Sequence, residues 1–99
     1  MERITEKQLN ALASRLNRLT NSPMEYMTDG KINVGHFHIS HAYGGVCLHR
    51  THNDGGGVST PLSGGHITKR ELYEQMHAFL NGIEFGMDIQ TKSINAFKE

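Results

Sequence analysis

The sequence predicts an α+β domain of two layers, in which two helices lie on one face of a small antiparallel sheet. Two observations support this fold class. One helix-start motif occurs twice in the chain, and between the two copies apolar and polar residues alternate with the period of two that is typical of strands. The predicted order is therefore helix, three or four strands in an antiparallel meander, helix. At 99 residues, the chain is long enough for one domain with a single modest core.

Both predicted helices begin with an isoleucine, a threonine and, three residues after the threonine, a glutamine or glutamate. The two copies of this motif are residues 4–9 and 67–72. In such a capping box the threonine hydroxyl accepts a hydrogen bond from the third helical amide, and the longer side chain accepts one from the threonine N–H. We therefore expect Thr5 and Thr68 to be N-caps, with each isoleucine packed against the leucine five residues later.

The first predicted helix carries one narrow apolar stripe at spacings of three and four residues, formed by Leu9, Leu12, Leu16 and Leu19. This helix should end at Thr20 or Asn21, because Pro23 follows. A stripe of this kind is typical of a helix that faces a core, although a dimer seam has the same spacing.

The second predicted helix carries a broader apolar stripe, formed by Leu72, Met76, Phe79, Leu80 and Ile83. We expect Gly82 or Gly86 to end it. Residues 1–86 then make up a single α+β domain. Residues 87–99 lack a strong periodicity and are predicted to form a partly ordered C-terminal tail.

Turn signals divide the region between the helices into strands. These signals are Asp29-Gly30, Ala42–Gly45 and Asn53–Gly57. The strands that flank them are predicted at residues 24–28, 31–41, 46–51 and 58–62, the second with an interruption at Gly35 between residues 31–34 and 36–41. Pro61 places the last of these at a sheet edge. Apolar residues stand at even positions before Gly35, as at Ile32, and at odd positions after it, as at Phe37. We therefore expect a bulge at Gly35, where the extra residue would return the apolar side chains to one face of the strand.

The turn at residues 42–45 determines which side chains face the helices and which face away from them. Phe37, Ile39 and Leu48 should be buried against the helix stripes. On the opposite face the register sets His38 against His49 and adds two more side chains, those of His36 and Cys47.

This polar face is the first candidate binding site. Imidazole and thiolate are suitable zinc ligands, so a metal-binding protein that uses His36, His38, His49 and Cys47 is one alternative. A flat sheet face does not gather four ligands tetrahedrally, and the chain has no CxxC or HExxH motif. A solvated face rich in imidazole, with no cofactor, is the simpler interpretation.

Lys69 and Arg70, at the start of the second helix, form the second candidate binding site. The order helix, three strands, helix is also that of double-stranded-RNA-binding domains, in which basic residues at this position contact phosphates. A nucleic-acid-binding module is therefore a further alternative. Ten basic and ten acidic residues give a net charge of zero, which argues against a partner held mainly by charge.

No residue pattern in the chain indicates catalysis. The one cysteine, Cys47, lies in the middle of a predicted strand, where cysteine is usually a packing residue. The polar start, Met1–Gln8, has no apolar signal core, and no apolar run approaches the roughly 18 residues of a membrane helix. We therefore expect a cytoplasmic protein that is not an enzyme and does not associate with a membrane.

Three runs of sequence, together with the leucine-rich opening segment, resemble a family of small orphan proteins encoded by tailed bacteriophages and prophages. The three runs are AYGGVCLHR, NDGGGVSTPLS and KRELYEQMHAFLNGIEFG, and the opening segment is TEKQLNALASRLNRLTNSP. The resemblance extends over residues 5–86. It implies a fold rather than a reaction, a bacterial cytoplasm, and a role outside particle assembly, such as modulation of the host.

The leading hypothesis is a non-enzymatic accessory protein that acts by binding a host or phage protein and is itself a homodimer. The dimer contact is expected at the open sheet face or at the edge near residues 58–62. Six of the seven histidines lie between His36 and His66. Histidines at such a contact would become charged below about pH 6 and loosen the dimer.

Overall fold

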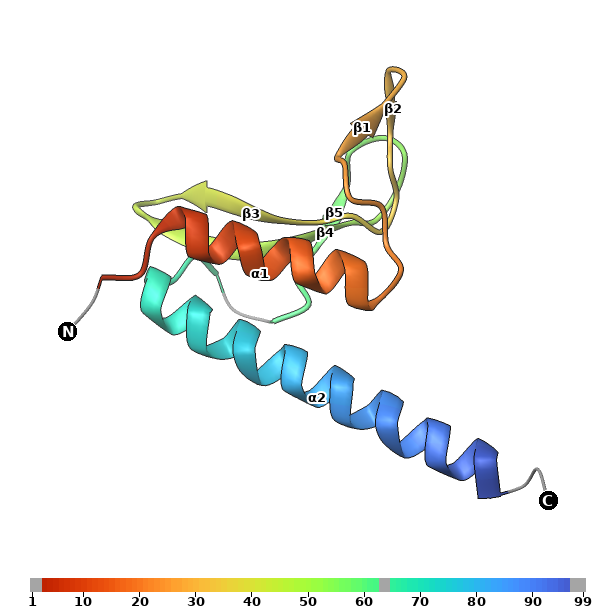
Figure 1. The fold of residues 1–99 in the computed structure, drawn as a ribbon. Helices are drawn as coiled ribbons and strands as arrows, with labels where there is room; N and C mark the ends of the chain where they lie inside the picture. Colours follow the sequence, from red (N-terminus) through yellow and green to blue (C-terminus); the bar gives the residue numbers. More distant parts are fainter. Residues whose placement is uncertain (1–2, 63–64, 97–99) are drawn as a thin grey trace.

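The computed structural model describes residues 3–62 and 65–96, with the backbone alone for residues 93–96. It confirms the α+β class and the helix, sheet, helix order (Figure 1). The elements are α1 (Glu6–Leu19), β1 (Met27–Thr28), β2 (Lys31–Ile32), β3 (Phe37–Ala42), β4 (Gly45–Thr51), β5 (Val58–Ser59) and α2 (Lys69–Ala96).

Both predicted capping boxes are present. The Gln8 N–H donates to the Thr5 hydroxyl at 3.2 Å, and the Thr5 N–H donates to the Gln8 side chain at 2.8 Å. At the second helix the Glu71 N–H donates to the Thr68 hydroxyl at 3.1 Å, and the Thr68 N–H donates to the Glu71 carboxylate at 3.2 Å. Each cap therefore satisfies backbone N–H groups that have no partner inside the helix.

The end of α1 is confirmed, whereas the predicted end of α2 is wrong. Thr20 caps α1 and Asn21 adopts a left-handed φ of 55°, as is common after a helix. In contrast, α2 passes through Gly82 and Gly86 without either residue taking a positive φ, and it continues to Ala96. Glycine lowers helix propensity but ends a helix only where the chain turns at it, and residues 87–96 therefore extend α2.

The outer part of α2 projects beyond the rest of the domain (Figure 1). From Glu84, which pairs with Arg15 of α1, to Lys92, every side chain of this helix is exposed. None of the helices in the described part of the chain combines the length and the apolar character needed to cross a membrane.

The strands form two small antiparallel sheets rather than one meander. The hairpin β1–β2 turns at Asp29 and Gly30, with φ values of 52° and 78°, as the sequence indicates. The chain then turns at Gly35, whose φ is 96°, and enters the second sheet, β3–β4–β5. The interruption predicted at Gly35 is present, but it separates two sheets instead of forming a bulge within one strand.

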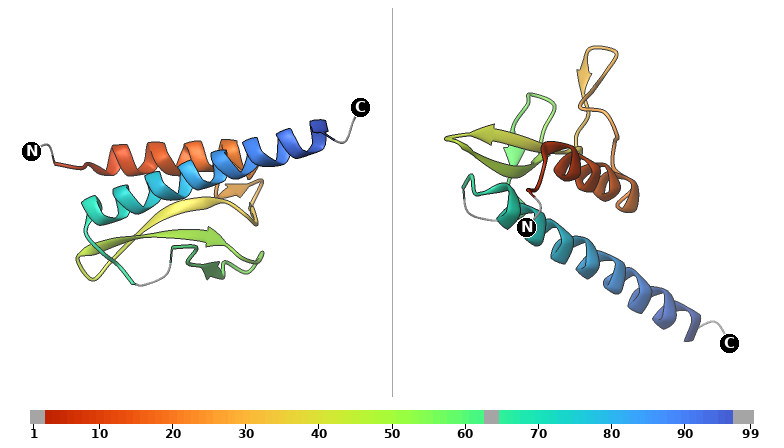
Figure 2. Two further views of the ribbon diagram at one scale, coloured as in Figure 1. Left: turned by 90° about the horizontal axis from the view of Figure 1, so that it is seen from below. Right: turned by 60° about the vertical axis from the view of Figure 1, so that its left-hand side comes forward.

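The register of β3 and β4 agrees with the prediction, with Ile39 opposite Leu48. Phe37 and Leu48 are buried, and Ile39 packs against the same core at its margin. That core also contains the helix residues Leu9, Leu12, Leu16, Leu72, Met76 and Leu80, with Phe79 at its edge. Both helices lie on one face of the sheet, α1 over β3 and α2 over β4 (Figure 2).

Two further contacts complete the second sheet. β5 is only two residues long, pairs with the end of β4 and stops before Pro61, consistent with an edge position. At the other end of β4, Val46 and Ile67 exchange two backbone hydrogen bonds of 2.8 Å. This bridge holds the segment before α2 against the sheet.

A buried asparagine joins α1 to β3. The Asn17 side chain, 2% exposed, donates to the Phe37 carbonyl at 3.0 Å and accepts from the Phe37 N–H at 2.8 Å. These backbone groups point away from β4, so Asn17 takes the place of a neighbouring strand. The sequence pattern of α1 does not reveal this role.

We expect Thr5→Ala and Thr68→Ala each to lower the free energy of unfolding by about 1 kcal/mol, because each removes a cap. Urea denaturation measures the change. Thr91→Ala, at an exposed position inside α2, is the matched control and should cause no loss. Two cap variants as stable as the wild type would show that the caps contribute nothing.

Asn17→Ala should cost about 3 kcal/mol, because it leaves the N–H and carbonyl of Phe37 buried without partners. The same substitution at Asn10, which is exposed on α1, should change stability by less than about 0.5 kcal/mol. Urea melts of the two variants give the comparison. Equal losses would mean that the Asn17 contact is not a principal link between α1 and the sheet.

Candidate functional site: a histidine and tyrosine face

The predicted pairing brings three histidines together on the sheet. His38 of β3 lies directly opposite His49 of β4, and their rings are 5.7 Å apart, edge to face. His36, just before β3, stacks on His38 with ring centroids 5.6 Å apart. Because successive residues of a strand point to opposite faces, these rings lie away from the side chains that enter the core.

Three more aromatic rings extend this row. Tyr26, from the segment before β1, contacts His38 at 5.6 Å and His36 at 6.2 Å. At the other end His66 contacts His49 at 6.0 Å and Tyr43 at 5.8 Å. We call this set the His–Tyr face: Tyr26, His36, His38, Tyr43, His49 and His66.

His66 reaches the face because its neighbour Ile67 is bridged to β4. The Nε2 atom of His66 also lies 3.2 Å from the Ser40 hydroxyl, which fixes the ring over β3. Sequence reasoning missed Tyr26, Tyr43 and His66. The only signal that includes His66 is the concentration of histidines between residues 36 and 66, and no spacing rule identifies the two tyrosines.

Tyr43 has the least typical conformation of the six. It occupies the first position of the β3–β4 turn with a φ of 52°, followed by Gly44 at 73°. Asparagine, aspartate or glycine is the usual residue there, because a left-handed φ is costly for a large side chain. Tyr43 is 98% exposed, so its ring gains little from packing.

Burial favours the neutral forms of the two central histidines, His38 and His49. It lowers the pKa of His38, as do the imidazoles of His36 and His49, against an opposing effect of the His36 carbonyl. Burial also lowers the pKa of His49, with a further contribution from His66. The Nδ1 atom of His38 is buried without a hydrogen-bond partner among the described residues.

His36 and Cys47 have structural partners of their own. The His36 Nδ1 atom lies 2.9 Å from the Pro23 carbonyl and 3.4 Å from the Asn17 amide nitrogen. Cys47 is 4% exposed, its thiol donates to the Leu48 carbonyl at 3.6 Å, and burial raises the pKa of the thiol. A thiolate is therefore disfavoured at this position, both as a ligand and as a nucleophile.

The proposed ligand set does not form a metal centre in the structure. Within residues 3–62 and 65–96, no group of three or more His, Cys, Asp and Glu side chains is arranged to hold a metal ion. The rings of His36, His38 and His49 stack or meet edge to face instead of directing nitrogens at a common point.

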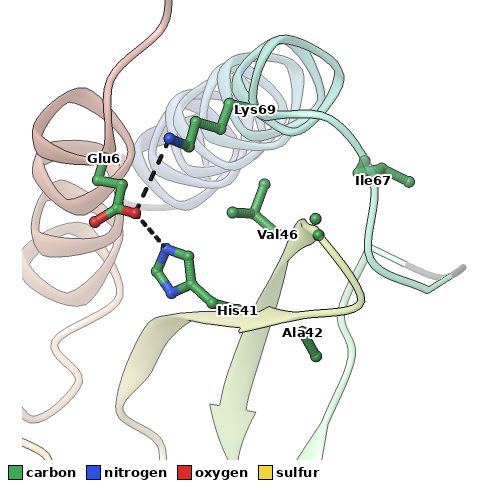
Figure 3. Close-up of a pocket in the computed structure, with 8 residues that line it drawn as sticks. Glu6, His41, Ala42, Val46, Ile67 and Lys69 are labelled. Atoms are coloured by element: carbon green, nitrogen blue, oxygen red, sulfur yellow. Dashed lines mark ion pairs between the residues drawn. The ribbon is translucent and has the colours of Figure 1, made fainter.

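Lys69 occupies a separate pocket of about 390 Å³, where the starts of α1 and α2 meet the β3–β4 turn (Figure 3). The Glu6 carboxylate lies 3.2 Å from His41 Nε2 and 4.0 Å from Lys69 Nζ. Arg70 is exposed beside Lys69. Because a carboxylate repels phosphate, Glu6 makes the pocket a poor site for a nucleic-acid backbone, and Lys69 and Arg70 do not join the His–Tyr face.

A comparison of this chain with protein-family models, with curated protein sequences and with solved structures finds no match.

The lowered pKa values of His38 and His49 predict acid-sensitive stability. Below about pH 6.5 the unfolded chain binds more protons than the folded protein, so the free energy of unfolding should fall as pH drops through this window. His38→Gln should flatten that slope, as measured by urea denaturation at about pH 7.5 and about pH 5.5.

Asn10→Ala is the control for this experiment, because Asn10 is exposed on α1, away from the His–Tyr face, and does not titrate. It should shift stability equally at both pH values. If His38→Gln kept the full slope of the wild type, His38 would not be a source of the acid sensitivity.

Proposed function

We propose that this chain is a non-enzymatic accessory protein that binds another protein through the His–Tyr face, with Tyr43 as the anchor. The observation that carries the proposal is the conformation of Tyr43, a large side chain held at a left-handed φ and almost fully exposed. Backbone strain of this kind costs stability and is found preferentially at functional positions.

The fold has no need of this side chain. Asparagine or glycine would make the same turn with less strain, and removing the ring would take no residue from the core. Tyrosine is, however, one of the residues that contribute most to binding energy at protein interfaces, since it combines a large apolar ring with a polar tip.

The neighbouring rings suit the same use. The pKa values of His38 and His49 are lowered, which favours their neutral forms, so the face combines aromatic rings and hydrogen-bonding nitrogens with little charge to desolvate. Depletion of charge and enrichment in aromatic rings are typical of the centre of a protein interface. The contacts between the rings also hold them in place before binding, which lowers the entropy lost on association.

The biological setting rests on the sequence resemblance to small phage and prophage proteins. It suggests a bacterial cytoplasm and a host or phage protein as the partner, bound in order to modulate the host. Bacterial lysate, with and without phage infection, is accordingly the material in which to search for the partner.

Tyr43→Asn tests the proposal, because it should separate binding from folding. Asparagine tolerates a left-handed φ, so the variant should be as stable as the wild type or up to about 1 kcal/mol more stable. Its affinity for the partner should fall about tenfold or more. The measurement is quantitative mass spectrometry of the lysate proteins retained on the immobilised wild type and on the variant.

Asp29→Asn is the matched control, because Asp29 has the same φ at the turn of the other hairpin. A protein retained by the wild type and by the control, but lost from Tyr43→Asn, would support the proposal. Equal retention by all three, or no protein retained by the wild type, would contradict it.

A further inference from the structure

The face of α2 that points away from the core carries a second row of residues. They are spaced alternately three and four positions apart, as in a seam between two helices: Gln75, Ala78, Gly82, Phe85 and Ile89. None of the five is charged and all are exposed, with Phe85 at 67% and Ile89 at 49%.

The centre of this row is a glycine that the chain itself does not require. A Cβ atom added to Gly82 would meet nothing within 4 Å, and its φ is not positive. Glycine in the interior of a helix is destabilising relative to alanine. A missing side chain at this point does, however, allow a second helix to approach closely.

The row also contains both a protrusion and a matching recess. Phe85 projects three residues after Gly82. Before Gly82, Ala78 helps to line an apolar groove of about 470 Å³, together with Pro61, Leu62, Gln75 and Phe79. In an antiparallel pair of helices that cross at Gly82, position 85 of one helix lies against positions 78–79 of the other. Each Phe85 ring would then enter the groove of the opposite chain.

The charges at the two ends of the row select the same arrangement. The next positions in the spacing are Glu71 at one end and Lys92 at the other, and both side chains are exposed. Antiparallel pairing about Gly82 sets Lys92 of one chain beside Glu71 of the other. Parallel pairing would set like charges against each other, which is destabilising.

From this self-complementarity we propose that the chain forms a two-fold dimer through the outer face of α2, with the two helices antiparallel and crossing at Gly82. The contact is isologous, because the same surface serves both copies. It also gives the projecting part of α2 a surface against which to pack. It differs from the sheet-edge contact near residues 58–62 that the sequence predicts, because the two surfaces share only Pro61 and Leu62. It also does not depend on the His–Tyr face.

Light scattering of the full chain at roughly 100 µM, a concentration suited to an interface of modest size, tests the proposal. The wild type should have the mass of a dimer. Phe85→Glu should shift the equilibrium to the monomer by about tenfold or more, without changing the circular dichroism spectrum, because Phe85 is outside the core. Thr91→Glu, exposed on another side of the same helix, should leave the dimer intact.

A cross-link tests the register. In Gly82→Cys the two introduced thiols face each other across the two-fold axis, and oxidised glutathione should convert them to an intermolecular disulfide. Thr91→Cys should cross-link far less, and native Cys47 is buried and does not compete. A monomeric wild type, a dimer unaffected by Phe85→Glu, or equal cross-linking of the two cysteine variants would each overturn the proposal.

Discussion

The contact between Asn17 and the backbone of Phe37 determines how the two layers meet. By donating to the carbonyl and accepting from the N–H of one residue, the Asn17 amide fixes α1 against the edge of β3. Phe37 then faces the core, and the alternation of the strand turns its neighbours His36 and His38 the other way. A slip of one residue would bury imidazoles and expose the phenyl ring. The His–Tyr face therefore depends on an interaction made at the edge of the sheet.

Features specified within a few residues could be predicted from the sequence. The capping boxes at Thr5 and Thr68 are examples, as is the β3–β4 register, which follows from the length of one glycine turn. The extent of α2 could not be predicted in this way. Gly82 and Gly86 have the residue type that often ends a helix, but no local interaction turns the chain there.

Only the central residues of the candidate site, on β3 and β4, could be predicted from the sequence. His38 and His49 are neighbours because of the register, whereas Tyr26 and His66 reach them through contacts between distant parts of the chain. Tyr26 comes from the segment before the separate β1–β2 sheet, and His66 reaches the face because Ile67 bridges to Val46. Asn17 was missed for the same reason, since an asparagine inside a helix does not reveal which backbone groups it will meet.

The projecting half of α2 also affects how the molecule can be handled. The chain extends 54 Å along its longest axis, and the described helix ends at Ala96, far from the β3–β4 turn that carries Tyr43 (Figure 1). A reporter or surface anchor attached near the outer end of α2, at the exposed Thr91 for example, therefore stands well clear of the tyrosine ring. In a dimer with antiparallel α2 helices the outer ends of the two helices point in opposite directions, so fluorophores attached there would report association through a distance that depends on the length of α2.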